Sequence, residues 1–333
     1  MDQDLLTYIK WPQYRQALQL PEKIEEEYQL LAQGEYNRNY LFTHPATGQK
    51  LLFRVNYGSQ MHLEDQIGYE YQALKLLENS GRTPRPFYVD GSCVKIPHGV
   101  MVMEYLPGGP LDYGRDLALA AECLADIHRV KADGARFLIR AENPLKAILD
   151  ECEEMFQKYV DSPLADKDKI RKIQNMLKKG WNRVDALSPA PYLCCINTEL
   201  NSTNFLINGK KNKNYLIDWE KPLYGDPAQD LGHFLAPTTT FWKTDVILEQ
   251  KEMEGFIQEY ICRAGQFMDV SGLRERTFVY IPVTCLRGIT WCAMAWIEYQ
   301  EPGKTIFNAS TFHKLEQYLD MEFLDRIDHF IGQ

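Results

Sequence analysis

Two short apolar runs, each followed by a polar loop, constrain this chain more than any other feature. The first run ends at Ile196 and leads into a loop with a carboxylate at Glu199 and an amide at Asn204, five positions later. The second run leads to Asp218, 14 positions after Asn204. Short apolar runs bounded by polar residues are typical of small strands. The pattern therefore predicts two short strands that carry a site.

These residue types, in this order, match the needs of phosphoryl transfer. The reaction needs a carboxylate to receive the proton of the acceptor hydroxyl, and oxygen ligands to hold Mg²⁺ against the nucleotide phosphates. A lone acidic residue near an Asn is a common surface loop. Two such carboxylates at strand ends are much harder to obtain by chance, so the spacing favours phosphotransferase chemistry.

The periodicity of the chain changes from strands to helices near residue 107. The first part contains one helical pattern, at 63–79, and four strand patterns, at 36–43, 50–57, 85–89 and 99–106. After the Pro-Gly-Gly-Pro sequence at 107–110, helical patterns follow at 117–129, 145–159 and 170–184, and again from 241 onward. Three short strand patterns interrupt them, at 193–196, 205–207 and 215–217. This layout predicts an α+β, protein-kinase-like fold with two lobes.

We place the lobe boundary at the end of the last long strand pattern. Residues 1–103 are expected to form a small β-rich lobe that binds a nucleotide. Residues 104–333 are expected to form a larger helical lobe with the catalytic loop, the metal site and an acceptor pocket.

The charge of the chain argues against nucleic-acid binding. The 333 residues are 45% hydrophobic and 25% charged, with a net charge of −9. A nucleic-acid binder would need a basic stripe to neutralise phosphates. An acidic surface would suit a cationic substrate, although it is more simply explained by solvation.

Neither end of the chain predicts a targeting or membrane segment. The first residues lack the basic and apolar regions of a signal peptide, and the most apolar late stretch, 288–297, is too short to cross a bilayer. We therefore expect no membrane association and a cytoplasmic location. The eight Cys residues lack CxxC pairs, so we expect them to be reduced and mostly buried.

With Asp218 followed by Trp219-Glu220, and with Gly225-Asp226-Pro227 and Asp230-Leu231 a few residues later, the sequence resembles the aminoglycoside phosphotransferase and choline kinase superfamily. The resemblance covers roughly residues 20–330, and its specific part is confined to 196–232. It implies that Asp218 and Asn204 are Mg²⁺ ligands and that Glu199 stands where the family has its catalytic Asp. It also implies mainly structural roles for Asp226 and Asp230, and Asp230 precedes an apolar helix that it could begin.

The first lobe adds nucleotide-binding candidates by the same resemblance. Gly34 and Asn37 match the loop that covers the nucleotide, although such a turn can also be a plain hairpin connection. Arg54 matches the residue that contacts the α- and β-phosphates, and Glu70 its ion-pair partner. The resemblance also implies that the backbone of the connector between the lobes would contact adenine, which adds two candidates, Glu104 and Leu106. His128 and His233 are expected to be structural.

The catalytic loop departs from the family pattern. The sequence Asn197-Thr198-Glu199 stands where the family has His-Gly-Asp. Asn197 could replace some hydrogen bonds of the His. The longer Glu199 moves its carboxylate by about 1 Å, and such a misplacement can cost on the order of 100-fold in rate unless the backbone compensates.

The acceptor pocket is expected among the C-terminal helices, where aromatic residues and carboxylates would suit an amine through cation–π and charge contacts. The candidates are Glu220, Trp242, Trp291, Trp296 and Glu298. Aromatic residues at helical spacing are also common in protein cores.

Two functions from different classes follow. The first is ATP- and Mg²⁺-dependent transfer of the γ-phosphoryl group to a hydroxyl of a small, amine-bearing molecule. The second is a catalytically silent, kinase-like protein that binds a ligand or partner. A protein kinase is less favoured, since only a dozen residues separate Asp218 from Asp230 and leave little room for a peptide platform.

Overall fold

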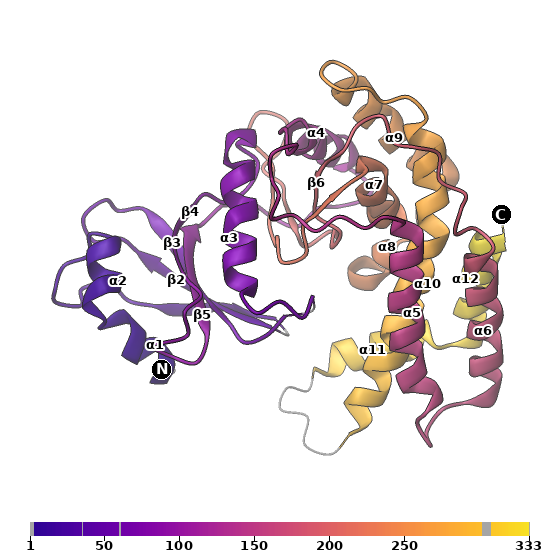
Figure 1. Cartoon of the computed structure of the whole chain (residues 1–333), viewed down its shortest axis with the longest axis horizontal. Helices are drawn as coiled ribbons and strands as arrows, with labels where there is room; N and C mark the ends of the chain where they lie inside the picture. Colours follow the sequence, from indigo (N-terminus) through magenta and orange to yellow (C-terminus); the bar gives the residue numbers. More distant parts are fainter. Residues whose placement is uncertain (1–2, 35, 60, 302–307, 333) are drawn as a thin grey trace.

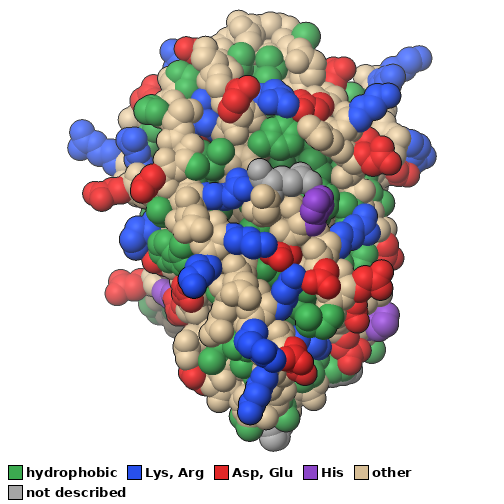
Figure 2. All heavy atoms as spheres, turned by 90° about the vertical axis from the view of Figure 1, so that its right-hand side faces the viewer, with side chains coloured by type: hydrophobic (Ala, Val, Ile, Leu, Met, Phe, Trp, Pro, Cys, Tyr) green, Lys and Arg blue, Asp and Glu red, His purple; other side chains and the backbone are tan. Residues whose placement is uncertain are grey.

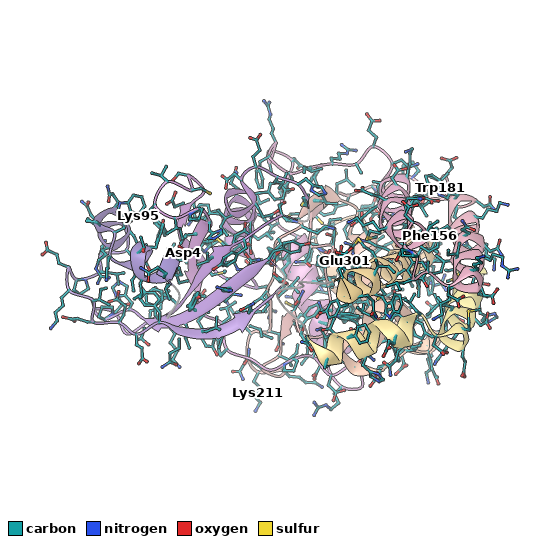
Figure 3. All side chains as sticks on the ribbon, turned by 90° about the horizontal axis from the view of Figure 1, so that it is seen from below. Asp4, Lys95, Phe156, Trp181, Lys211 and Glu301 are labelled. Carbon is teal, nitrogen blue, oxygen red and sulfur yellow. The ribbon has the colours of Figure 1, made fainter. Side chains whose placement is uncertain are left out.

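Two lobes lie side by side along the longest axis of the molecule (Figure 1). The computed structural model describes residues 3–34, 36–59, 61–301 and 308–332. Seen from below, the lobe that contains the sheet, Asp4 and Lys95 lies at one end, and the helices with Phe156 and Trp181 lie at the other (Figure 3). The α+β, kinase-like fold is therefore confirmed. The boundary between residues 103 and 104 falls near the end of the last long strand and stays a prediction.

The first lobe is built on a five-stranded antiparallel sheet with the strand order β1-β2-β3-β5-β4. Its strands are β1 (Gln29–Gln33), β2 (Asn37–Thr43), β3 (Lys50–Asn56), β4 (Pro86–Asp90) and β5 (Gly99–Glu104). The four predicted strands of this lobe thus correspond to β2, β3, β4 and β5 and are confirmed. The sequence analysis did not find β1 or the two N-terminal helices, α1 (Gln3–Ile9) and α2 (Pro12–Ala17).

The alternation of side chains along β3 gives the sheet two different faces. Phe53 is fully buried and its ring lies 5.7 Å from that of Tyr8 and 5.6 Å from that of Tyr14, measured between centroids. The next residue, Arg54, points to the opposite face because successive strand side chains alternate. On that face Arg54 meets Glu70 of α3 (Gln66–Leu77). The sheet therefore packs one face on the N-terminal helices and turns the other toward the second lobe.

The second lobe surrounds one long helix, α10 (Leu273–Gln300), which packs on α5 (Pro144–Val160) and α7 (Pro227–Leu235). The other helices are α4 (Leu117–His128), α6 (Lys167–Trp181), α8 (Pro237–Thr244), α9 (Gln250–Ala264), α11 (Ala309–Tyr318) and α12 (Met321–Gly332). Lys, Arg, Asp and Glu side chains are interspersed over the outer face of this lobe (Figure 2).

The length of α10 corrects the expectation of a short apolar stretch. With 28 residues, it is the one helix of the described residues that is long and apolar enough to cross a membrane. However, 67% of the relevant window is buried inside the protein. The core helix of a globular protein has the same length and composition, so this feature is weak evidence for a membrane span.

Two small antiparallel ribbons lie within the helical lobe. β6 (Cys194–Ile196) pairs with β9 (Leu223–Gly225), and β7 (Phe205–Leu206) pairs with β8 (Tyr215–Leu216). The three predicted short strands are confirmed, and β9 was missed. Six of the eight Cys residues are buried and none forms a disulfide in the described residues, as expected.

Candidate active site

A buried carboxylate, Asp230, fixes the loop that follows β6. Asp230 is completely buried, and its oxygens accept the backbone N–H groups of Asn197 and Thr198, each at 2.7 Å. The buried imidazole of His128 lies 3.1 Å from the same carboxylate. Buried bonds between a carboxylate and backbone N–H groups are charge-assisted, so they hold the loop firmly. The structural role predicted for His128 is confirmed.

The position of Asp230 in α7 corrects one detail of the prediction. Asp230 lies inside the helix and does not begin it. Asp226 is the N-cap, and its side chain accepts the backbone N–H of Ala228 at 3.0 Å. Asp226 also pairs with Arg276 of α10 at 2.6 Å.

Asn197 joins the catalytic loop to the predicted metal site. Its amide nitrogen donates to the backbone oxygen of Asp218 at 2.8 Å, and its amide oxygen accepts the N–H of Glu199 at 3.0 Å. Asn204 donates through its side chain to the backbone oxygen of Glu199 at 2.9 Å. The N–H of Ile217 donates to the backbone oxygen of Asn204 at 2.9 Å. The structure therefore brings Asn197, Glu199, Asn204 and Asp218 together.

The loop after β6 and the loop after β8 each contain a non-glycine residue whose backbone lies in the left-handed region of φ. Thr198 has φ = 66° and Asp218 has φ = 68°. Such conformations are costly and persist only where neighbouring contacts hold them. The hydrogen bonds of Asn197 and Asp230 supply these contacts.

Arg54 is the centre of an acidic cluster between the lobes. Its guanidinium lies 2.5 Å from Glu70, 3.7 Å from Asp218 and 3.8 Å from Glu220. Burial and the nearby charge of Asp218 raise the pKa of Glu220 well above its usual range. One buried oxygen of Glu70 has no hydrogen-bond partner in the described residues. One guanidinium thus faces three carboxylates. Further positive charge at this site would therefore be stabilised.

The donor set of this cluster fits Mg²⁺. Asn204 uses its amide nitrogen within the protein, so its amide oxygen is the atom that could join the Asp218 carboxylate as a ligand. No group of three or more His, Cys, Asp or Glu side chains in the described residues is arranged to hold a metal by itself. Mg²⁺ commonly takes one or two protein oxygens and completes its shell with water and phosphate oxygens.

The other nucleotide candidates lie around the sheet. The side chain of Asn37 donates to Glu220, and the backbone N–H of Gly34 donates to the oxygen of Asn37 at 2.9 Å. These contacts place Asn37, and Gly34 bonded to it, beside the acidic cluster. Glu104 is at the end of β5, where its N–H donates to Arg85 at 2.8 Å, and Leu106 is buried in the connector. No contact in the described residues links Glu104 or Leu106 to Arg54 or Asp218.

The carboxylate of Glu199 is held by two cations of the helical lobe. Arg287 of α10 donates to it at 2.9 Å, and Lys221 lies 3.5 Å away. Both cations also contact Glu151 of α5, Arg287 at 2.9 Å and Lys221 at 3.2 Å. Burial alone would raise the pKa of Glu199, but Arg287 and Lys221 outweigh it and lower this pKa to about 2. Glu199 is therefore an ionised carboxylate within a neutral set of four charges.

Two of the predicted acceptor residues line a pocket beside Glu199. The pocket has a volume of about 170 Å³ and includes Trp242, Trp291, Arg287 and His233. The two indole rings meet edge to face with centroids 5.3 Å apart. Asp218 does not line this pocket, so the two key carboxylates have separate surroundings.

The structure does not bring the other three acceptor candidates into this pocket. Trp296 packs on Tyr159 with ring centroids 6.2 Å apart, and Glu298 lies 3.8 Å from Lys158. Glu220 belongs to the cluster around Arg54 instead.

Three charged residues of the site were missed. They are Glu151, Lys221 and Arg287. Arg287 could have been found from the sequence, since it is the one charged residue in the apolar run 277–297. A lone charge on a buried helix needs a partner.

The fold and the site define a two-lobed, kinase-like phosphotransferase of the kind that acts on small molecules. The family model described as "Phosphotransferase enzyme family" matches residues 27–264, and the chain belongs to this family. No curated protein matches the sequence closely enough to be counted as a relative.

Solved structures share the fold over most of their length. Spectinomycin phosphotransferase in complex with ADP and spectinomycin is 12% identical, with a TM-score of 0.63 over 92% of this chain and 93% of the other. Choline kinase from Cryptosporidium parvum Iowa II is 16% identical, with a TM-score of 0.67 over 100% and 97%. Ethanolamine kinase from Plasmodium vivax is 15% identical, with a TM-score of 0.63 over 94% and 86%. At these identities the likeness shows the fold alone.

Proposed function

We propose that the protein transfers the γ-phosphoryl group of ATP, with Mg²⁺, to a hydroxyl of a small molecule. The observation that supports this most is the link through Asn197, which ties the backbone of Asp218 to that of Glu199. This link joins the Arg54 cluster, in which carboxylates outnumber cations, to the Glu199 carboxylate on the wall of the acceptor pocket. Phosphoryl transfer depends mainly on positioning and electrostatics, and this arrangement supplies both.

Each charged group then has one task. Arg54, held by Glu70, would contact the nucleotide phosphates. Asp218 and Asn204 would hold Mg²⁺, which neutralises charge on the phosphates when it is bound. Glu199 would accept the proton of the acceptor hydroxyl, a contribution worth roughly 10² to 10⁴ in rate.

The contact with Arg287 supports a catalytic role for Glu199 where the family has an Asp. The longer side chain reaches α10, where Arg287 fixes its carboxylate on the pocket wall at 2.9 Å. Arg287 is thus a positioning residue for Glu199.

The acceptor proposed from the sequence is amine-bearing, and the Trp242–Trp291 pair supports it. Aromatic faces attract ammonium groups. The structural neighbours include proteins named for choline and ethanolamine. The carboxylate expected at Glu298 is not in the pocket, so the indole rings would carry this recognition.

A second candidate function is a silent kinase-like binding protein. Its specific support is that the Glu199 carboxylate is already paired with two cations. Such a carboxylate could serve the fold alone.

Thermal unfolding and a turnover assay separate the two functions. Ligand at about 100 times Kd stabilises the folded state by roughly 2.7 kcal/mol, so ATP with Mg²⁺ is expected to raise Tm in the wild type and much less in Asp218→Asn. Product formation with a panel of hydroxyl acceptors, lost in Glu199→Gln while ATP binding is kept, supports the enzyme. ATP binding without turnover across the panel supports the silent protein. If ATP with Mg²⁺ changes the Tm of neither the wild type nor Asp218→Asn, the proposed nucleotide site is wrong.

A further inference from the structure

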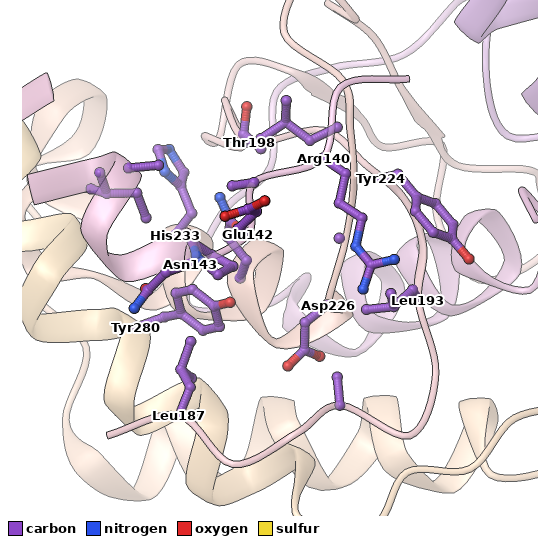
Figure 4. A pocket seen from close by; sticks show the side chains of 18 of the residues that line it. Arg140, Glu142, Asn143, Leu187, Leu193, Thr198, Tyr224, Asp226, His233 and Tyr280 are labelled. Atoms are coloured by element: carbon purple, nitrogen blue, oxygen red, sulfur yellow. The ribbon is translucent and has the colours of Figure 1, made fainter. Parts of the chain in front are cut away.

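A second, larger cavity lies inside the helical lobe beside the acceptor pocket. Its volume is about 510 Å³, within the roughly 300–1,000 Å³ typical of small-molecule sites. It is bounded by the start of α5, the segment 184–190, β9 and the middle of α10. Arg140, Tyr224, Asp226 and Tyr280 are arranged around it in Figure 4. Three side chains, His233, Thr284 and Arg287, line both this cavity and the acceptor pocket and so lie between them.

Three polar side chains on the cavity wall are buried and have no hydrogen-bond partner among the described residues. Tyr280 is 1% exposed, Thr284 is 5% exposed and Gln229 is 8% exposed. Buried polar groups in proteins are nearly always satisfied, by protein, water or ligand. Their polar atoms are not sealed in the core, in contrast to the unpartnered hydroxyl of Tyr113. The cavity is therefore the place from which a ligand would reach them.

The charged groups of the cavity leave hydrogen-bond donors in excess. Both oxygens of Glu151 are used by Arg287 and Lys221. Both oxygens of Asp226 are used by Arg276 and the N–H of Ala228.

The donors of the same wall are not used up. Arg287 employs Nε and Nη2 in its ion pairs, and its Nη1 makes no hydrogen bond among the described residues. Lys221 shares its three protons between two carboxylates. Tyr280 and Thr284 add hydroxyl donors. The carboxylate oxygens of Glu151 and Asp226 are thus engaged, whereas several donors on the same wall have no partner among the described residues.

We propose that this cavity is a binding site for the carboxylate of a small organic acid, separate from the acceptor pocket. The acid would accept hydrogen bonds from Tyr280 and Thr284 and face the charge of Arg287. Its hydrocarbon body would lie on an apolar wall formed by Ile148, Leu187, Leu193 and Leu223. The carboxylates of Glu142 and Asp185 also line the cavity, but both residues are exposed, so water screens their charge.

The test is ligand binding without nucleotide, so its result is independent of the proposed phosphotransferase function. Two matched pairs serve as probes: phenylacetate with phenylacetamide, and hexanoate with hexanamide. Saturation-transfer NMR and titration with the wild type are expected to show binding of at least one acid and a weaker response to its amide. Equal response within both pairs, or none, overturns the proposal.

Two variants locate the binding. Tyr280→Phe combined with Thr284→Val is expected to weaken binding of the acid by about tenfold or more, since two donors are lost. Tyr113→Phe is the matched control, because it also removes an unpartnered buried hydroxyl but lies outside the cavity. Unchanged binding in the double variant, with its Tm close to that of Tyr113→Phe, places the acid elsewhere and overturns the proposal.

Discussion

Arg287 donates to the carboxylate of Glu199 at 2.9 Å across 88 positions of sequence. The same guanidinium donates to Glu151 at 2.9 Å. One residue of the long central helix therefore holds both the predicted base and the helix opposite it. Because a carboxylate that is misplaced by about 1 Å can cost on the order of 100-fold in rate, this contact bears directly on turnover.

Replacing Arg287 with Met is expected to lower kcat by about 10- to 100-fold, because Glu199 loses the contact that fixes its position. Binding of ATP with Mg²⁺ should change less than about twofold, since the ion pairs of Arg287 are with Glu151 and Glu199 and not with the Arg54 cluster. Steady-state kinetics and nucleotide titration measure the two effects. Arg287→Lys should restore part of the rate.

The matched control is Arg274→Met. Arg274 lies on the same helix and pairs with Glu254, away from both cavities. Its loss should leave kcat unchanged. A full rate in Arg287→Met would show that Glu199 needs no such support.

Glu151 makes a pH-dependent contribution to stability. Burial would raise its pKa, but Arg287 and Lys221 outweigh burial and lower it to about 2. A pKa below the unfolded value of about 4.3 means that the ionised group stabilises the fold above that pH, and that the gain is lost as pH falls toward 2. The side chain is 38% exposed, so solvent screening reduces the effect to roughly 1–2 kcal/mol.

Glu151→Gln is therefore expected to unfold in less urea than the wild type at pH 7. The difference should shrink as pH falls from about 4.3 toward 2, as measured by urea unfolding across this range. Glu154→Gln, an exposed position on the same helix, should match the wild type at every pH. A constant difference would mean that the ion pairs are not its cause.

Local patterns were sufficient to predict three of the four short strands, β6, β7 and β8, and the loop of the site. The catalytic loop, Asn204 and Asp218 lie within 22 positions, so their spacing fixes much of their geometry. The structure adds that Asn197 makes two hydrogen bonds, one on each side of the site. That contact extends the prediction without contradicting it.

Contacts between distant segments could not be predicted in the same way. Arg287 and Glu151 are 136 positions apart, and only the packing of α10 on α5 brings them together. The acceptor candidates show the limit of helical spacing. Glu298 follows Trp291 by seven residues, which keeps the same face but lies about 10 Å further along the helix. Trp296 follows by five residues and faces another direction, toward Tyr159.

Asp230 is expected to be essential for folding of the catalytic loop. In Asp230→Asn the side chain cannot accept with both atoms, so one of two buried backbone N–H groups loses its partner. The free energy of unfolding should fall by about 2–4 kcal/mol, measured with urea. The exposed residue Asp185 gives the control, and Asp185→Asn should change stability by less than about 0.5 kcal/mol. Equal stability of the two variants would contradict the structural role of Asp230.

The indole pair is expected to decide acceptor affinity. Trp291 lines the pocket beside Glu199, whereas Trp296, on the same helix, packs on α5. Trp291→Phe keeps an aromatic ring but removes the larger face, so KM for the acceptor should rise by about 3- to 30-fold with little change in the binding of ATP. Trp296→Phe makes the same chemical change outside the pocket and should leave KM unaltered. If both variants raise KM equally, the effect comes from packing of α10, and the acceptor does not bind at the Trp242–Trp291 pair.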